Sequence, residues 1–598
     1  MPTRARGTLA SCALGLLLVL TAPGGSARVG SPTTDPHPKA QTGVGSAVRW
    51  VRVEANLFVD RPADLLPTLT AARDAGANGI VLVDSKTMSW PGFDRDDRRF
   101  WLQRARAVRD DAHGLGLELV LDTDPLGYCS SLLSYDVDLA AGVPVRRAPL
   151  VVRGGRLVPE QTSALPNGSF ERFGGDTVRG WTYQDDPGTA TVVDTSVAHD
   201  GAASLRMEPT GDATRVFGEV RVRPFQQYVL SFWVRASGLT ASYLGPYVAS
   251  PDGRTRLSDQ MWSDRGRDGS YFSSADGLDL GWTQQRIAFD SRELHRVGIG
   301  LGAWGHTGGT LWVDDVRVTP APTLNLLRRP DLPLRLTTGS GRPLVEGRDV
   351  ERVRDPGLGR QSWRGTYDTF HRGPSPRLLA GSGLRTGDRV LLTGQAATVT
   401  MSGQVGCSWN HPDVLALLRR IHAANQRALH PDGFMLGLDE IRSGGWDPQD
   451  ARFASSGDAL AHHLTRVLAD LREVAPGVPV YVWSDMFDPT QNAVRHYYQV
   501  KGSLRHSWRT LRPGSVTIVN WKAGSELRRR GERSVRHFAD LGFRQVLAGF
   551  YDEPVARNHD DWVAAAGDAP RIRGSMYTSW EEDYSALPEF GSLWWPPA

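Results

Sequence analysis

The chain has 598 residues, too many for one ordinary domain, so its length predicts at least two. Hydrophobic residues make up 40% of it and charged residues 23%, which excludes a wholly disordered, collagen-like or disulfide-scaffold protein. The net charge is only +3, and the densest basic run is Arg528 to Arg530, so the sequence argues against a nucleic-acid partner.

Residues 1–27 have the pattern of a secretory signal. Two arginines precede the apolar stretch Leu9 to Leu20, and small residues at Gly25-Ser26-Ala27 follow it. An uncleaved membrane anchor is the alternative, but the stretch is shorter than the roughly 20 apolar residues that span a bilayer. Residues 28–46, rich in Ser, Thr, Pro and Gly, are typical of a linker. We therefore expect a secreted protein that has no membrane contact once the signal is removed.

Two cysteines, Cys129 and Cys407, remain after the expected signal. In an oxidising compartment they can form a disulfide. The alternative is a pair of buried, unpaired thiols, because the sequence alone does not place their Cα atoms.

Short apolar strands followed by helices occur on both sides of a large insertion. This alternation predicts a parallel sheet covered on both faces. The expected strands are Val48 to Leu57, Gly79 to Asp84 and Leu117 to Asp122, then Gly433 to Leu438, Val478 to Ser484, Ser515 to Asn520, Gln545 to Tyr551 and Gly574 to Ser579. Eight strands close a TIM (β/α)₈ barrel, so we predict an α/β fold with barrel parts at residues 47–165 and 412–598. A ninth strand-like segment, Asp388 to Leu392, is assigned to a hairpin in an accessory segment, residues 321–411.

Residues 166–320 lose helical periodicity and predict an inserted antiparallel β-sandwich. Their landmarks include Asn167 to Glu171, Gly180-Trp181, Tyr228 to Ala236 and Leu311 to Val318. The order and spacing of these landmarks resemble the jelly-roll carbohydrate-binding modules of families 4, 9 and 22. The resemblance implies a carbohydrate partner and a structural calcium ion held by Glu171 and Asp315, for which two surface carboxylates are the alternative.

Acidic and aromatic residues gather where the barrel strands end, which is where barrels of this kind carry their chemistry. The residues there include Asp84, Asp122, Asp124, Asp439, Glu440, Trp483, Asp485, Trp521, Tyr551, Asp552, Glu553, Trp580 and Glu581. A carboxyl group with a raised pKa can protonate a glycosidic oxygen, a second group can stabilise or attack the sugar, and aromatic walls can hold the ring. For Asp84 and Asp122 the alternative is a helix N-cap. No catalytic zinc spacing is present, so we expect no cofactor for catalysis.

The Asp439-Glu440 pair at the end of the fourth strand resembles the Asp-Glu pair of glycoside hydrolase family 20. Trp483 with Asp485, Tyr551 with Asp552 and Trp580 with Glu581 are similar to other strand ends of that family. The resemblance implies that Glu440 is the general acid and that Asp439 orients the 2-acetamido group of the substrate, which acts as the nucleophile. It also implies that Tyr551 steadies the acetamido oxygen and that Glu581 binds outer hydroxyls. The chain differs from the family at Leu436-Gly437-Leu438 and in lacking a clear first-strand arginine, since Arg52 precedes the strand end.

The sequence thus predicts a secreted glycosidase that cleaves a poly- or oligosaccharide, with Trp483, Asp485, Trp521, Asp552, Trp580 and Glu581 as substrate-binding residues. One alternative is a two-carboxylate retaining glycosidase, with Glu440 as acid/base and Glu553 as nucleophile. Another is a non-catalytic, secreted polysaccharide-binding protein. The sequence does not indicate the sugar, its anomeric configuration or endo against exo action, and we expect a monomer.

Overall fold

The computed structural model describes residues 48–160, 165–259, 275–360, 364–368, 370–401, 403–550 and 552–596. The expected signal, residues 1–27, and the expected linker, residues 28–46, lie outside these ranges. Among the described residues, no helix combines the length and the hydropathy needed to cross a bilayer.

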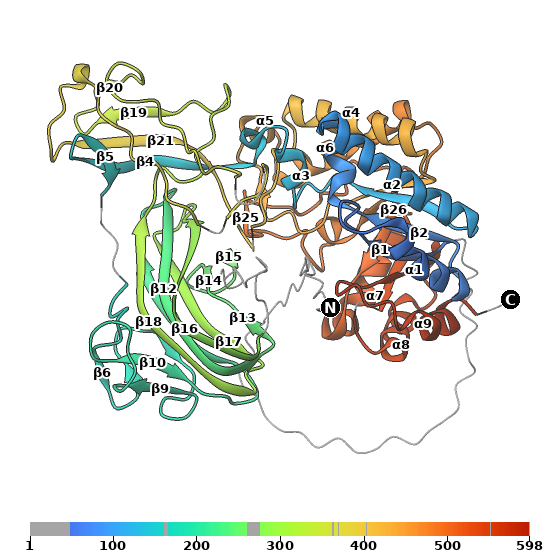
Figure 1. The fold of residues 1–598 in the computed structure, drawn as a ribbon, viewed down its shortest axis with the longest axis horizontal. Helices are drawn as coiled ribbons and strands as arrows, with labels where there is room; N and C mark the ends of the chain where they lie inside the picture. The colour runs from blue at the N-terminus through green and yellow to red at the C-terminus, as the bar shows by residue number, and fades with distance from the viewer. Residues whose placement is uncertain are drawn as a thin grey trace.

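Eight parallel strands close into a barrel, with the sandwich and the accessory sheet on the other side of the molecule (Figure 1). Strand β1 pairs with β2 and also with β28, the last strand, so the sheet has no free edge. In barrel order the strands are β1 (Val48–Glu54), β2 (Gly79–Val83), β3 (Glu118–Thr123), β22 (Gly433–Leu436), β24 (Val480–Trp483), β26 (Thr517–Trp521), β27 (Arg544–Phe550) and β28 (Ile572–Thr578). Their side chains point alternately to the barrel interior and to the helices outside, which is why both faces are apolar.

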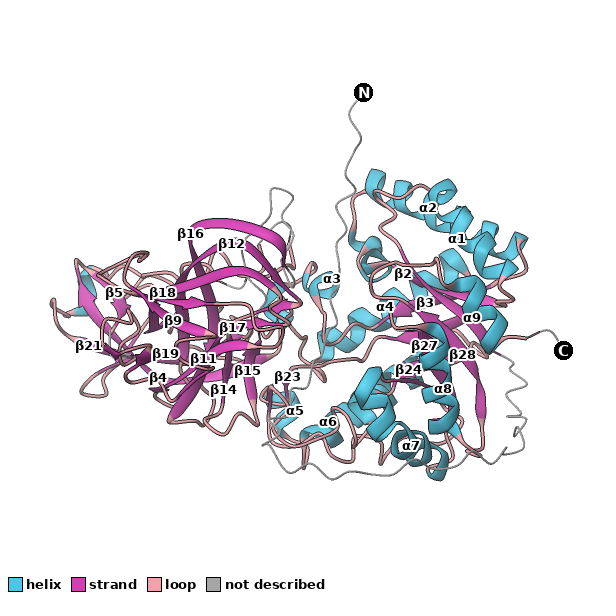
Figure 2. Ribbon diagram, turned by 90° about the horizontal axis from the view of Figure 1, so that it is seen from below, coloured by secondary structure: helices cyan, strands magenta, loops and turns pink. Residues whose placement is uncertain are grey.

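Helices lie around the barrel (Figure 2). The two longest begin at capped ends: Asp94 accepts hydrogen bonds from the amides of Asp96 and Asp97, and Ser455 Oγ accepts one from the amide of Asp458. The helices are α1 (Pro62–Asp74), α2 (Arg95–Gly114), α4 (Pro412–Leu429), α6 (Ser456–Val474), α7 (Gly524–Asp540), α8 (Val555–Ala566) and α9 (Leu587–Trp594), with the short α3 (Ser130–Leu133) and α5 (Pro448–Ala451).

The inserted sandwich consists of two antiparallel sheets packed over one apolar core. Its first sheet has the order β16 (Ala275–Asp290), β12 (Gln227–Ala241), β18 (Gly308–Pro320), β10 (Ser204–Met207) and β9 (Thr191–Asp194). The second has the order β15 (Arg256–Asp259), β14 (Tyr247–Ala249), β17 (Arg296–Trp304), β11 (Thr214–Arg221) and β8 (Tyr183–Gln184), and β13 (Tyr243–Leu244) also pairs with β17. A small ribbon, β6 (Phe173–Gly174) with β7 (Thr177–Val178), precedes them.

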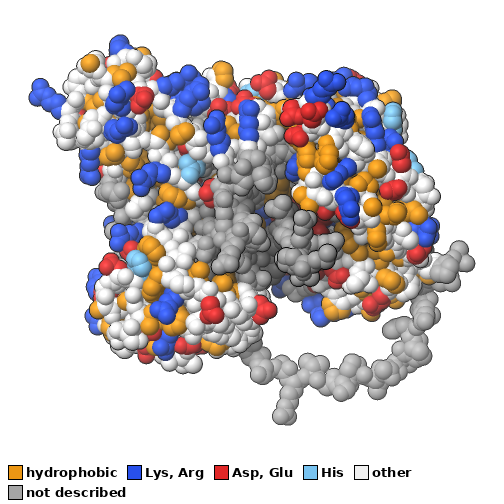
Figure 3. Space-filling view, in the orientation of Figure 1, with side chains coloured by type: hydrophobic (Ala, Val, Ile, Leu, Met, Phe, Trp, Pro, Cys, Tyr) orange, Lys and Arg blue, Asp and Glu red, His pale blue; other side chains and the backbone are white. Residues whose placement is uncertain are grey.

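A separate accessory sheet combines segments from both sides of the sandwich. Its order is β20 (Pro343–Leu344), β19 (Arg335–Thr338), β21 (Arg389–Ala397), β4 (Gly142–Arg153) and β5 (Arg156–Pro159). Strand β21, which covers most of the ambiguous segment 388–392, therefore lies outside the barrel. Residues 142–159, which we expected in a loop of the first barrel part, belong to this sheet because β4 pairs with β21 along its length. Many Lys and Arg side chains lie over this part of the molecule in the space-filling view (Figure 3).

A disulfide joins Cys129 and Cys407 across a sequence separation of 278 residues, with their Cα atoms 5.6 Å apart. The sequence left this pairing open against two free thiols. Backbone hydrogen bonds flank it, from the Cys129 amide to the Val405 carbonyl and from the Cys407 amide to the Leu126 carbonyl. The bond therefore fixes two loops to each other on either side of the insertion.

The sandwich contacts the barrel through the loops that follow β24 and β22. The side-chain amide of Gln499 donates to the carbonyls of Leu257 and Asp290, each at 3.1 Å. Arg292 of the sandwich is 2% exposed and donates to the Tyr498 carbonyl at 2.6 Å. Gln499 and Val500 form β25 (Gln499–Val500), which pairs with β23 (Ser443–Gly444), so the contact reaches the loop after β22.

Candidate active site

Three tryptophans lie together at the carboxyl end of the barrel. The ring centroids of Trp483, Trp521 and Trp580 are 6.0 to 6.4 Å apart in every pair. Trp483 and Trp521 belong to the apolar cluster that fills the barrel, and the partly exposed Trp580 packs against it. The expected aromatic residues therefore form one surface, with Trp580 as its accessible member.

Two carboxyl groups face each other across Gly437, directly after strands β3 and β22. A Cβ atom at Gly437 would lie 3.0 Å from Asp122 Oδ1 and 3.6 Å from Asp439 Oδ1, so the two oxygens are separated by less than about 7 Å. Both side chains are partly exposed. Glycine at this position leaves the space between the two carboxyl groups open.

The environment of these carboxyl groups favours protonation. Burial, with the nearby charges of Glu440 and Asp122, raises the pKa of Asp439 to about 7. Burial also raises the pKa of Asp122 to about 7, although Arg52 acts in the opposite direction. A carboxyl group with such a pKa holds a proton near neutral pH and can donate it to a substrate.

A third carboxyl group, Asp485, lies behind this pair and is fully buried. Its oxygens accept hydrogen bonds from the Glu440 amide at 2.8 Å, from Asn492 Nδ2 at 2.7 Å and from Trp521 Nε1 at 3.4 Å. Burial, followed by the charge of Asp439, raises its pKa to about 7. Asp485 therefore fixes the backbone of the Asp439-Glu440 pair from below and has no access to solvent.

Glu440 has a different environment from its neighbour. It pairs with Arg442 at 2.9 Å, and the two side chains are 3% and 2% exposed. The hydroxyl of Tyr128 donates a hydrogen bond to its other oxygen. Such contacts stabilise the ionised carboxylate, so they do not favour the expected role of Glu440 as proton donor.

The loop that carries Tyr128 packs closely on the backbone of the Asp439-Glu440 pair. A Cβ at Gly127 would lie 2.5 Å from the Asp439 carbonyl oxygen, so only glycine fits there. From the other side of the disulfide, Gln404 Nε2 donates to the Glu440 carbonyl at 2.9 Å and its Oε1 accepts from Arg442 at 2.6 Å. The two disulfide-linked loops thus hold the pair from both sides.

Arg52 lies in the site even though it precedes the end of its strand. Its guanidinium carbon is 4.3 Å from the ring centroid of Trp580, and it pairs with Glu54 at 2.5 Å. Asp552 accepts hydrogen bonds from the Trp580 amide and from Ser579 Oγ, both at 2.7 Å, and so positions the Trp580 backbone. The sequence assigned no clear role to Arg52 because it precedes the end of its strand. Every second side chain of a barrel strand points into the barrel, and this alternation could have placed Arg52 in the site.

Other expected residues have different surroundings or lie outside the described ranges. A Cβ on Gly524, the first residue of α7, would lie 2.8 Å from Glu553 Oε1, so the Glu553 side chain lies beside the start of that helix. Asn558 Nδ2 donates a hydrogen bond to Glu553 Oε2. Glu581 is exposed, and Tyr551 lies outside the described residues. Asp84 caps the turn after β2 by accepting from the Lys86 amide at 2.8 Å.

The two carboxylates expected to bind calcium both have protein partners. Glu171 accepts from the amides of Ala202 and Ala203 at 2.9 and 3.1 Å, and Asp315 pairs with Arg317 at 2.6 Å. Within the part of the chain that the structure describes, no three His, Cys, Asp or Glu side chains are grouped as metal ligands. These contacts offer no support for the calcium expectation.

One face of the sandwich carries a row of aromatic rings. Phe217 and Tyr247 are 6.2 Å apart between centroids, and Tyr183, 50% exposed, pairs with Phe217 across the strands. Glycines on β17 make room for these rings, because a Cβ at Gly300 would lie 2.2 Å from the Tyr247 ring and one at Gly298 would lie 2.0 Å from Phe217. Flat rings of this kind suit stacking against sugars.

A family model described as "Carbohydrate binding domain" matches residues 162–258. The chain contains a carbohydrate-binding domain. No curated protein matches the chain. The match covers the first part of the sandwich, including the strands that carry Tyr183, Phe217 and Tyr247.

Solved structures share parts of this architecture at low similarity. TmCBM61 in complex with β-1,4-galactotriose is 20% identical, covers 27% of this chain and 99% of its own, and has a TM-score of 0.19. A rhamnosidase from Novosphingobium sp. PP1Y is 11% identical over 90% of this chain and 56% of its own, with a TM-score of 0.30. A β-N-acetylhexosaminidase is 13% identical over 33% of this chain and 46% of its own, with a TM-score of 0.24. These values assign no activity to the barrel.

Proposed function

We propose that the barrel is a glycoside hydrolase acting on a poly- or oligosaccharide that the carbohydrate-binding domain also binds. The observation that carries the proposal is the facing pair Asp122 and Asp439, both partly exposed and both with a pKa of about 7, beside the tryptophan surface. Glycoside hydrolysis needs a carboxylic acid to protonate the leaving oxygen and a second carboxylate nearby.

The two carboxyl groups have unequal surroundings, and this inequality suggests their roles. The charge of the neighbouring Glu440 raises the pKa of Asp439, so we assign Asp439 as the general acid. Arg52 favours the ionised form of both carboxyl groups, but for Asp122 it is the largest effect after burial, so we assign Asp122 as the base or nucleophile. Trp580, under the guanidinium of Arg52, is the ring on which the sugar stacks.

This assignment differs from the family 20 pattern, in which Glu440 would be the acid. Glu440, paired with Arg442, instead supplies the fixed negative charge that raises the pKa of Asp439. The same ion pair is also the observation that favours the second candidate, a non-catalytic polysaccharide-binding protein. That candidate keeps the carbohydrate-binding domain and assigns no chemistry to the barrel.

The test is hydrolysis of a panel of chromogenic glycosides and soluble polysaccharides by the full chain. We expect Asp122→Asn and Asp439→Asn to lower kcat/KM at least about 100-fold, the scale of lost acid–base catalysis. Asp560→Asn, at an exposed site on α8, is the matched control and keeps full activity. Retention on insoluble glycans with no product from any substrate would establish the non-catalytic candidate, and activity that depends on Glu440 but not on Asp439 would restore the family 20 assignment.

A further inference from the structure

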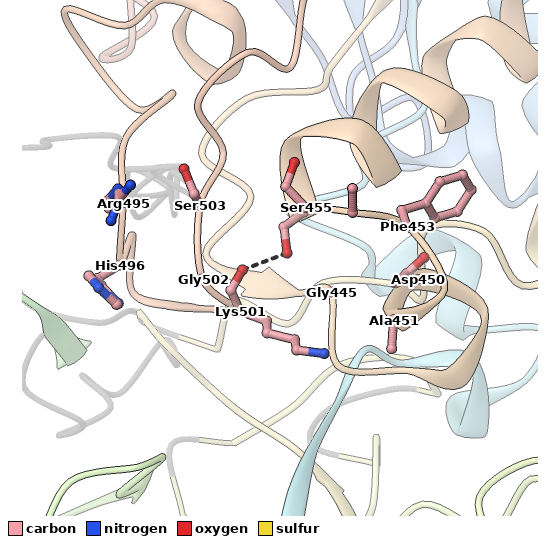
Figure 4. A pocket seen from close by; sticks show the side chains of 12 residues that line it. Gly445, Asp450, Ala451, Phe453, Ser455, Arg495, His496, Lys501, Gly502 and Ser503 are labelled. Atoms are coloured by element: carbon pink, nitrogen blue, oxygen red, sulfur yellow. Dashed lines mark hydrogen bonds between the residues drawn. The ribbon is translucent and has the colours of Figure 1, made fainter.

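Two adjoining cavities open beside the start of α6, outside the proposed catalytic pair. Figure 4 shows the residues that line the first of them. Their volumes are about 310 and 330 Å³, within the range of pockets that hold small ligands. Ala454, Ser455, Arg495 and Ser503 line both cavities, so the two form one continuous cleft. We call it the basic cleft.

Basic side chains dominate the lining of the basic cleft. They are Arg495, His496, Lys501, Arg505, His506 and Arg509. Two acidic residues also line it, and Asp458 is engaged with Ser455 Oγ at 2.7 Å. Within the described ranges, no carboxylate lies within ion-pair distance of the three arginines or of Lys501. Three arginines and Lys501 therefore line the basic cleft without a carboxylate partner among the described residues.

The backbone that presents these charges is fixed. The His496 amide donates to the Gly502 carbonyl at 2.8 Å, and the Gly457 amide of α6 donates to the Ser503 carbonyl at 2.9 Å. Ser456 Oγ donates to the Lys501 carbonyl at 2.6 Å. The loop is therefore anchored to α6, and binding an anion would need only side-chain adjustment.

The floor of the basic cleft offers an acceptor and a ring. Asp450 is 2% exposed, and its Oδ1 accepts from both amide groups of Asn410, while its Oδ2 has no hydrogen-bond partner among the described residues. A buried oxygen of this kind usually has a partner, and a hydroxyl group can supply one. The half-buried ring of Phe453 lies beside it in the lining.

We propose that the basic cleft binds an acidic sugar unit, in which an oxyanion contacts Arg495 and its basic neighbours while a ring hydroxyl donates toward Asp450. Arginine forks match the geometry of carboxylate, sulfate and phosphate oxygens, so this shared chemistry defines the ligand class. An inorganic anion would contact the basic side chains of the cleft but would make no contact with Asp450 Oδ2 or the Phe453 ring. The inference does not depend on catalysis in the barrel, because its readout is binding.

Calorimetric titration of the full chain with trigalacturonate and with neutral galactotriose tests the proposal. We expect trigalacturonate to bind at least 10-fold more tightly, with an affinity that falls as salt increases. The double variant Arg495→Ala/Arg505→Ala loses this preference, whereas Arg472→Ala/Arg533→Ala, which removes two exposed arginines outside the cleft, keeps it. Thermal unfolding of both variants checks that each is folded.

Three results would overturn the proposal. Equal affinities for the acidic and the neutral trisaccharide would remove the role of charge. A preference that survives the loss of Arg495 and Arg505 would move the acidic-sugar site elsewhere, for example to the sandwich. Inorganic phosphate or sulfate binding the cleft as tightly as trigalacturonate would reduce it to a simple anion site. Hydrolysis assays are run separately, so failure here leaves the proposed activity of the barrel untouched.

Discussion

At the scale of single residues, the site depends on how two arginines are distributed among five acidic side chains. Arg442 neutralises Glu440 and Arg52 pairs with Glu54, while Asp122, Asp439 and Asp485 have no ion-pair partner within the described residues. Burying a carboxylate without a partner is costly, so these groups hold their protons to higher pH. The chemistry proposed here therefore results from an unequal distribution of positive charge.

Asp439→Asn is expected to change the pH dependence of stability. A carboxyl group whose pKa is raised to about 7 on folding stabilises the native state at low pH, and this contribution is lost as pH rises from about 4 to 7. The variant does not ionise, so in urea unfolding it should gain about 2–3 kcal/mol relative to the parent between pH 5 and pH 8. Asp560→Asn serves as the control, and parallel curves for Asp439→Asn and the parent would refute the raised pKa.

The Glu440–Arg442 pair is expected to show strong coupling in a double-mutant cycle. Arg442→Gln alone leaves a buried carboxylate unpaired and should cost about 3–5 kcal/mol in the free energy of unfolding. Combined with Glu440→Gln, it should cost markedly less, because the unpaired charge is also removed. Additive losses measured by denaturant unfolding would mean that the pair is not an ion pair in solution.

At the scale of elements, the barrel strands could be predicted and the accessory sheet could not. Runs such as Gly79 to Asp84 are apolar on both faces and precede helices, and β2 lies within one residue of that prediction. By contrast, β4 pairs with β21 across more than 200 residues of chain, and no local pattern encodes that pairing.

The candidate site shows the same division. The ends of parallel strands meet at one edge, so strand order alone predicts that Asp122, Asp439 and Trp580 lie at the same end of the barrel. The partners of Glu440 could not be predicted from the sequence, because Tyr128 comes from a loop more than 300 residues away. Glu440 also has a backbone φ of 45°, in the left-handed region, so its side-chain direction does not follow from strand alternation.

On the sandwich, Gly300→Ala is expected to impair glycan binding. Its new Cβ would lie 2.2 Å from the Tyr247 ring and must displace it from the aromatic row. We expect at least a 10-fold loss of affinity for soluble glycans in affinity electrophoresis. Gly281→Ala on β16 is the matched control, since a Cβ there has nothing within 4 Å. Unchanged binding by Gly300→Ala would place the sugar site on another face.

At the scale of the whole molecule, a few residues connect the sandwich to the proposed catalytic centre. Trp446 Nε1 donates to the Gln499 carbonyl at 2.7 Å, and its ring lies 5.7 Å from Phe225 of the sandwich. The Gln499 amide in turn donates to the Arg442 carbonyl at 2.8 Å. The carbohydrate-binding domain is therefore packed on the loop that carries the partner of Glu440.

Trp446→Ala is expected to separate the unfolding of the two parts. Removing this ring takes away the packing against Phe225 and the bond to Gln499, so calorimetry should resolve two transitions where the parent shows more cooperative melting. Trp446→Phe retains the ring and should behave more like the parent. A single unchanged transition in Trp446→Ala would show that the contact contributes little.

The covalent link between Cys129 and Cys407 has a consequence for proteolysis. The sandwich and the accessory sheet both lie within the 278-residue span that it closes, so a protease that nicks an exposed turn there does not release either half of the barrel. Such a nicked molecule should migrate near full size on a gel without reductant and fall into two fragments once thiols are added. Damage to the carbohydrate-binding domain or to the accessory sheet would then leave the two barrel parts covalently joined.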